Sequence, residues 1–93
     1  MPRKYTITFA ISAVKDLEEI RTWYADREIP EVGDRLVSEV VKIVERLAEF
    51  PNSGRIVPEF GISQLREVIH PPFRVVYRVD EFRVRILRVW RSE

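Results

Sequence analysis

The last third of the chain, residues 65–91, alternates apolar and polar side chains with a period of two residues, and this pattern limits the possible folds more than any other feature. Three such runs follow one another: LREVIH, FRVVYRV and RVRILRVWR. They are separated by Pro71-Pro72 and by Asp80-Glu81, which are residue types that favour turns. The stretch therefore predicts three antiparallel strands joined by short turns.

The middle run, Phe73–Val79, carries apolar and aromatic side chains on one face and arginines on the other. Arg74 and Arg78 share the second face, because successive side chains of a strand point to opposite sides. An unpaired guanidinium is costly to bury, so this face is expected to meet water, an acidic partner or phosphate. Residues 65–91 contain seven arginines and only three acidic residues, and this composition leaves two interpretations open: an ordinary solvated face, or a surface that binds nucleic acid or an acidic protein partner.

The segments before these strands predict one further strand and two helices. Lys4–Phe9 alternates residues that favour β-structure and predicts a short strand. Ser12 is suited to cap a helix over residues 13–27, since its hydroxyl can bind a free amide of the first turn. Pro30 is tolerated in a first helical turn, and a broad apolar stripe predicts a second helix over residues 30–49. The breadth of that stripe indicates that the second helix packs against both the sheet and the first helix.

The predicted order of elements is β-α-α-β-β-β, within a single domain spanning residues 1–93. Residues 55–63 are expected to be irregular. This order predicts an α+β fold in which a helical hairpin packs on one face of a mainly antiparallel four-stranded sheet. The other face of the sheet is expected to stay open, and the arginines are expected to lie on that open face.

The last run, Arg83–Arg91, breaks its own alternation. Val84 and Ile86 have one parity, whereas Leu87 and Val89 have the other. Either a β-bulge lies near Ile86-Leu87, or the strand is buried on both faces as an interior strand of the sheet. Burial on both faces is the preferred interpretation, because the N-terminal strand could then pair with its free edge.

The composition excludes several classes of protein. The chain has no cysteine and one histidine, which excludes disulfides and thiolate metal sites. No apolar run is long enough to cross a bilayer, and the N-terminal residues lack the apolar core of a signal peptide. Glycine-rich phosphate-binding loops and known nucleophile motifs are missing from the sequence. A cytoplasmic protein without a metal, a cofactor or a membrane association is therefore expected.

One group of residues could carry chemistry: Arg55, Arg66, Arg74 and Arg78 together with Glu59. Such a cluster can in principle cleave RNA, with the carboxylate taking the proton of the 2′-hydroxyl and the arginines stabilising the charged phosphorane. The alternative is that Arg66 pairs with a glutamate within the protein and that the remaining residues are solvated.

Three further side chains have more than one possible role. His70, beside Pro71-Pro72, is expected to have a structural or turn role rather than one in acid–base catalysis. Tyr77 shares a strand face with Phe73, so packing in the core is its expected role. Trp90 is either part of the core or an exposed platform on which a base could stack.

Several short motifs occur in an order that resembles the RelE/ParE toxin superfamily. They are Asp16-Leu17-Glu18-Glu19-Ile20, Pro51-x-x-Gly54-Arg55-x-x-Pro58-Glu59, Leu65-Arg66-Glu67, Phe73-Arg74-Val75-Val76-Tyr77-Arg78-Val79 and Ile86-x-x-Val89. Each motif is loose, but together they cover nearly the whole chain. The resemblance implies a β-α-α-β-β-β toxin of a type II toxin–antitoxin module, held inactive by a cognate antitoxin whose acidic or amphipathic tail wraps it.

The superfamily divides by target, so the resemblance implies one of two activities. RelE-like members cut messenger RNA at the ribosome, and for them Arg74, Arg66 and Glu59 would be the catalytic residues. ParE-like members inhibit DNA gyrase without an enzymatic step. The nucleases usually place a His or Tyr near the C-terminus, where this chain has Val89-Trp90-Arg91-Ser92-Glu93, so the gyrase inhibitor is preferred. A third alternative is an inactive relative that retains only antitoxin binding.

The expected partners are a cognate antitoxin, in a hetero-oligomer, and either DNA gyrase or the ribosome with its mRNA. Tryptophan and arginine are common anchors of protein interfaces. The surface that binds the target or the antitoxin is therefore expected to consist of Arg55, Arg74, Arg78, Arg85, Arg88, Trp90 and Arg91.

Overall fold

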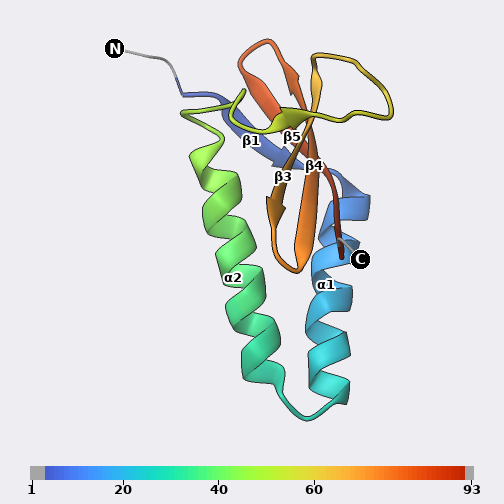
Figure 1. The fold of residues 1–93 in the computed structure, drawn as a ribbon. Coiled ribbons are helices and arrows are strands. Elements are labelled where there is room, and N and C mark those ends of the chain that lie inside the picture. The colour runs from blue at the N-terminus through green and yellow to red at the C-terminus, as the bar shows by residue number, and fades with distance from the viewer. Residues whose placement is uncertain (1–3, 92–93) are drawn as a thin grey trace.

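A sheet of five strands in the order β1-β5-β4-β3-β2 lies at the centre of the fold (Figure 1). The computed structural model describes residues 4–91. Strand β1 pairs with β5 in parallel, and all other neighbours are antiparallel. The elements are β1 (Thr6–Phe9), α1 (Ile11–Asp26), α2 (Pro30–Arg46), β2 (Arg55–Ile56), β3 (Leu65–His70), β4 (Phe73–Asp80) and β5 (Arg83–Arg91).

The predicted α+β fold and its element order are confirmed, with one strand added. Residues 55–63 are not wholly irregular, because Arg55 and Ile56 pair with Glu67 and Arg66 of β3. The prediction of four strands was therefore wrong, whereas the sheet is mainly antiparallel as predicted, with β1 and β5 as its one parallel pair in the described residues. A strand of two residues is too short to show a period in the sequence, so only its pairing with β3 reveals it.

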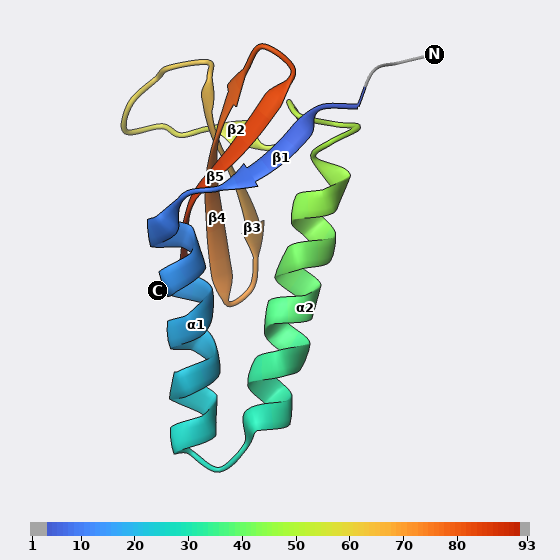
Figure 2. The ribbon, with the colours of Figure 1, turned by 180° about the vertical axis from the view of Figure 1, so that it is seen from behind.

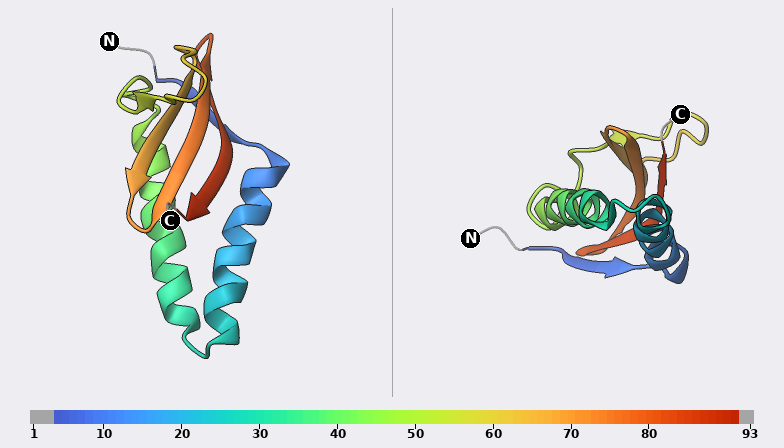
Figure 3. Two further views of the ribbon diagram at one scale, coloured as in Figure 1. Left: turned by 45° about the vertical axis from the view of Figure 1, so that its right-hand side comes forward. Right: turned by 90° about the horizontal axis from the view of Figure 1, so that it is seen from below.

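The two helices form a hairpin that packs on one face of the sheet (Figure 3). The turn between them lies beyond the ends of the strands (Figure 1). Val40 and Val44 of α2 are buried and belong to the same core cluster as Val75 and Tyr77 of β4. The broad apolar stripe of the second helix thus faces the sheet, as predicted.

Helix α2 begins at Pro30, as predicted, but ends at Arg46 because residues 47–49 form a turn. Its Gly33 lies against α1. A Cβ atom on Gly33 would come within 3.1 Å of the Cβ of Tyr24, so the missing side chain lets the two helices approach closely. Within residues 4–91, neither helix is long and apolar enough to span a membrane.

Helix α1 begins two residues earlier than predicted, at Ile11. The N-cap position is taken by Ala10, and no side chain caps the helix. The prediction that Ser12 caps this helix was therefore wrong. Instead, the Ser12 hydroxyl donates a hydrogen bond to the carbonyl of Leu87 in β5, over 2.9 Å.

Strand β5 contains a β-bulge. Val76 and Tyr77 are neighbours on β4, but their partners on β5 are Arg88 and Ile86, which leaves Leu87 as an extra residue. The bulge is therefore the correct explanation for the broken alternation. The preferred interpretation, burial on both faces, was wrong, because several β5 side chains on the face away from the helices are exposed. The predicted pairing with the N-terminal strand is confirmed, since β1 lies along β5 (Figure 2).

Beyond the end of β1, side chains of α1 replace it as the partner of β5. Strand pairing stops at Ile86, which leaves the following edge groups of β5 facing α1. Ser12 binds one carbonyl there, and the carboxylate of Asp16, one helical turn later, accepts a hydrogen bond from the N–H of Val89 over 2.8 Å. These contacts satisfy backbone groups that would otherwise be left without partners.

Candidate functional site

The sheet face turned away from the helices carries most of the predicted binding residues. Residues that lie opposite each other on paired strands point to the same side of the sheet. Arg74 lies opposite Trp90, and Arg78 lies opposite Arg85. We call this surface the arginine face, and it comprises Arg55, Arg74, Arg78, Arg85, Arg88 and Trp90.

Within the arginine face, Glu67 of β3 is buried, with a relative exposure of 1%. Its two carboxylate oxygens accept hydrogen bonds from the Nε atoms of Arg55 and Arg74. A second nitrogen of Arg74 lies 3.3 Å from the carboxylate of Glu59, which precedes β3. Ion pairing within the protein is therefore the arrangement observed for these two arginines.

Arg66 does not belong to the arginine face. It lies opposite Tyr77, whose side chain is in the core, and therefore points to the helix side of the sheet. Its guanidinium donates hydrogen bonds to carbonyl oxygens of residues 52, 54 and 63, over distances between 2.9 and 3.3 Å. Arg66 thus connects two loops, and the predicted cluster with Arg74 lacks this member. The alternative, in which Arg66 pairs with a glutamate, was also wrong, because its hydrogen bonds go to backbone carbonyls and Glu67 pairs with Arg55 and Arg74.

The remaining arginines of this face differ in how their charge is compensated. Arg78 donates to both carboxylate oxygens of Asp80, over 3.1 and 3.2 Å. Arg88 forms two hydrogen bonds with Asp16, over 2.8 and 2.9 Å, and this carboxylate raises the pKa of the Arg88 guanidinium above its ordinary value. Among the described residues, Arg85 has no ion-pair partner, so its charge is left to solvent or to a binding partner.

Trp90 lies close to two of these arginines. The guanidinium carbon of Arg88 is 4.8 Å from the centroid of the indole ring, and that of Arg74 is 5.9 Å away. Contacts of this kind attract a cation to the face of the ring and hold the indole in place. With a relative exposure of 39%, Trp90 is not a core residue. It is a partly exposed aromatic side chain held on the arginine face.

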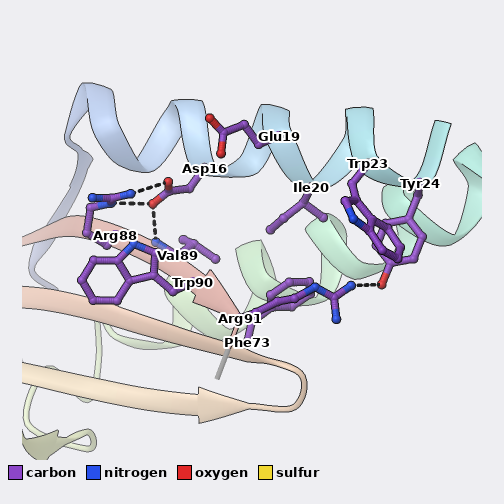
Figure 4. Close-up of a pocket in the computed structure, with 10 residues that line it drawn as sticks. All are labelled: Asp16, Glu19, Ile20, Trp23, Tyr24, Phe73, Arg88, Val89, Trp90 and Arg91. Atoms are coloured by element: carbon purple, nitrogen blue, oxygen red, sulfur yellow. Dashed lines mark hydrogen bonds and ion pairs between the residues drawn. The ribbon is translucent and has the colours of Figure 1, made fainter. Parts of the chain in front are cut away.

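A pocket of about 210 Å³ opens between α1 and the end of β5 (Figure 4). Arg91 points toward α1 there, where it donates a hydrogen bond to the hydroxyl of Tyr24 over 2.8 Å. Its guanidinium carbon also lies 4.8 Å from the ring centroid of Trp23. Arg91 therefore lines this pocket instead of joining the arginine face. Acidic Asp16 and Glu19 complete the polar part of the lining.

Neither His70 nor Tyr77 is placed to serve as an acid or base on the arginine face. His70 lies on the helix side, where its Nε2 is 3.0 Å from the carboxylate of Glu39 and this hydrogen bond lowers the pKa of Glu39. Tyr77 is fully buried, and burial raises the pKa of its phenol. Its hydroxyl donates to the carbonyl of Pro51 and accepts from the N–H of Gly54.

Of the three residues predicted to be catalytic in a nuclease, Arg74 and Glu59 are brought together and Arg66 is not. Among residues 4–91, no group of three or more His, Cys, Asp or Glu side chains could hold a metal ion. Ser92 and Glu93 lie outside the described residues. The arrangement is therefore a surface of cations around one aromatic side chain, and the exposed carboxylates of Glu59 and Asp80 pair with Arg74 and Arg78 there.

Two carboxylates that organise this surface, Glu67 and Asp16, were missed by the sequence-based prediction. Glu67 has the same parity as Leu65 and Ile69 in its strand, and Asp16 stands between Ala13 and Ile20 on the side of α1 that faces the protein. The available signal was a carboxylate within an otherwise apolar pattern. Such a group must find a partner, because burying a lone charge is very costly.

Comparison with known proteins identifies the family. The model of the ParE toxin of the type II toxin–antitoxin system parDE matches residues 7–93. No match was found among curated proteins.

Two toxin–antitoxin systems are among the solved structures that are similar to this chain. The chromosomal ParDE toxin–antitoxin system from P. aeruginosa has 26% sequence identity and a TM-score of 0.81, covering 97% of this chain and 98% of that one. The RelBE2 toxin–antitoxin complex from Mycobacterium tuberculosis has 22% identity and a TM-score of 0.72, covering 99% and 95% of the two chains, and it supports the fold alone. Since the family model spans almost the entire sequence, this chain belongs to the ParE toxins of type II toxin–antitoxin systems.

Proposed function

We propose that this protein inhibits DNA gyrase by binding to it, and that a cognate antitoxin neutralises it in a hetero-oligomeric complex. The match to the ParE toxin model supports gyrase as the target. The similar solved structures are toxin–antitoxin systems, which supports an antitoxin as the partner. Both interactions would take place in the cytoplasm.

The observation that carries this proposal is the charge compensation around Trp90. Arg74 is bound by Glu67, and Arg88 is bound by Asp16. The carboxylates offset most of the positive charge of these guanidiniums, which weakens the electrostatic stabilisation that they could give to the charge that develops in the transition state of RNA cleavage. The two arginines that these carboxylates bind lie over the indole ring of Trp90, and they hold it in position for binding. Tryptophan and arginine are the usual anchors of protein interfaces.

A supercoiling assay with purified gyrase tests this proposal. The wild-type toxin is expected to stop supercoiling. Trp90→Ala should raise the concentration for half-maximal inhibition about 10- to 30-fold, since the loss of an interface anchor costs about 1.4–2 kcal/mol. Arg46→Ala, an exposed position on α2 away from the arginine face, serves as the control and should change little. Gyrase that remains fully active at saturating wild-type toxin would refute the proposal.

One observation favours mRNA cleavage as a second candidate function: the guanidinium of Arg74 and the exposed carboxylate of Glu59 are 3.3 Å apart. If this pair were catalytic, ribosome-bound mRNA would be cut, which primer extension on the message detects. Arg74→Ala would then slow cleavage about 10²–10³-fold, whereas Trp90→Ala would have little effect. Activity in neither assay would point to the third candidate, a relative that only binds the antitoxin.

A further inference from the structure

The buried carboxylate of Glu67 holds two arginines of the arginine face in place. Its side chain has an exposure of 0%, and a buried carboxylate is tolerated only when it is paired and hydrogen-bonded. Here one oxygen is used by Arg55 and the other by Arg74. A single buried carboxylate thus anchors two guanidiniums. We call Arg55, Arg74, Glu67 and the neighbouring Glu59 the twin-arginine site.

The way in which the two arginines are anchored leaves donor atoms for a ligand. Both use Nε to bind Glu67, so their terminal nitrogens are not needed for that contact. The side chain of Arg55 is 65% exposed, and the hydrogen bonds within residues 4–91 include none for its Nη atoms. A guanidinium with a fixed orientation and free Nη groups is suited to bind a carboxylate or phosphate, because little conformational freedom is lost on binding.

Glu59 acts as an internal ligand of this site. Its carboxylate contacts a terminal nitrogen of Arg74 over 3.3 Å, which is long for a hydrogen bond between charged groups. The Glu59 side chain is 60% exposed. Exposed ion pairs contribute little to stability, so a competing carboxylate can displace Glu59 at small cost.

We propose that the twin-arginine site binds a carboxylate side chain from an acidic segment of a protein partner, and that Glu59 occupies the site until the partner displaces it. The inference rests on the proposed neutralisation by an antitoxin and names the chemistry of the segment that binds. The loop that carries Glu59 also exposes Phe60 and Ile62, with relative exposures of 63% and 48%. These side chains would contact apolar residues that flank the carboxylate of the partner.

The charges of the site favour a carboxylate over a nucleic acid. Arg55 and Arg74 are balanced by Glu67 and Glu59, so displacement of Glu59 leaves a single positive charge. One positive charge matches one carboxylate. A nucleic-acid strand would instead require several uncompensated cations along its phosphates.

Fluorescence anisotropy with two labelled probes, a hexaglutamate peptide and hexauridylate RNA, tests the inference on the whole chain. Glu59→Gln is expected to bind the peptide about two- to fivefold more tightly than the wild type, since the internal competitor is gone. Arg55→Gln should weaken binding by a similar factor. Glu45→Gln and Arg46→Gln are the matched controls, because they make the same charge changes at exposed positions of α2, away from the arginine face.

Three results would overturn the inference. The first is peptide affinity that changes equally in the variants and their matched controls, since only overall charge would then matter. The second is the absence of peptide binding, and the third is tighter binding of hexauridylate that depends on Arg55. All four substituted side chains are exposed, so melting temperatures near that of the wild type are expected and are measured for each variant. Gyrase takes no part in this titration, so its outcome is independent of the supercoiling assay.

Discussion

At the scale of single residues, Tyr77 ties a loop to the sheet. Its hydroxyl donates to the carbonyl of Pro51 over 2.8 Å and accepts from the N–H of Gly54 over 2.9 Å. A Cβ atom on Gly54 would come within 2.5 Å of this hydroxyl, so only glycine fits there without a shift of the surrounding atoms. The Pro51-x-x-Gly54 motif of the sequence thus reflects contact with a tyrosine 23 positions away.

Tyr77→Phe is expected to lower the free energy of unfolding by about 1–3 kcal/mol, because the backbone groups of Pro51 and Gly54 lose their partner. The effect should depend on pH. Burial raises the pKa of Tyr77 above its ordinary value of 10.0, so its contribution is fully present below pH 10.0 and is lost as the pH rises through the folded-state pKa. Urea unfolding of both proteins measures this. The difference between them should shrink above pH 10.0, and a difference that stays constant or grows would contradict the assignment.

At the scale of secondary-structure elements, α1 holds the end of β5 in place. Asp16 binds both Arg88 and the backbone of Val89, and Tyr24 binds Arg91. The strand that carries Trp90 is therefore positioned by a helix from the other end of the chain. Helix α2 has a different role, because its buried side forms part of the core under the sheet.

Val40→Asp is expected to unfold the protein. Val40 lies in the core with an exposure of 0%, and a carboxylate there has no partner among the surrounding apolar side chains. The expected loss is about 3–5 kcal/mol, close to the whole stability of a small domain. Ser38→Asp adds the same group on the exposed side of α2 and should change stability by less than about 0.5 kcal/mol. Thermal melting followed by circular dichroism compares them, and similar melting temperatures for both variants would show that this face of α2 is not buried.

At the scale of the whole molecule, a formal net charge of +1 conceals an uneven distribution. Arg78 and Arg85 face each other across β4 and β5, and only Arg78 has a carboxylate partner within the described residues. This end of the arginine face therefore keeps uncompensated positive charge. An acidic partner would be attracted to it over distances of about a Debye length, roughly 8–10 Å at physiological ionic strength.

The affinity for the cognate antitoxin, which we expect a neighbouring reading frame to encode, should fall as salt is added and in the double variant Arg78→Glu with Arg85→Glu. We expect a loss of about tenfold, or about 1.4 kcal/mol, because attraction becomes repulsion at two exposed positions. Arg46→Glu on α2 is the control for charge alone. Titration calorimetry at several salt concentrations measures these affinities, and an affinity insensitive to both salt and the double variant would exclude electrostatic docking on this face.

The sequence by itself determined the features that depend on neighbours along the chain. Apolar residues at helical spacing predicted α1 and α2, and alternation predicted the strands β3 to β5. The same alternation placed Arg74 and Arg78 on the open face and Tyr77 in the core, because side-chain direction in a strand follows from parity alone. Resemblance between short motifs was sufficient to identify the superfamily.

Only the tertiary structure decided which distant residues meet. Asp16 and Arg88 are separated by 72 positions, and the bulge at Leu87 changes which side chains of β5 share a face. A shift of one residue moves a side chain to the other side of a sheet, so register cannot be deduced from the pattern of a single strand. The sequence could therefore place Arg74 and Arg78 on the open face, but it placed Arg66 and Arg91 wrongly. The burial of Glu67 and the position of Asp16 decided which arginines are already neutralised and which keep their charge for a partner.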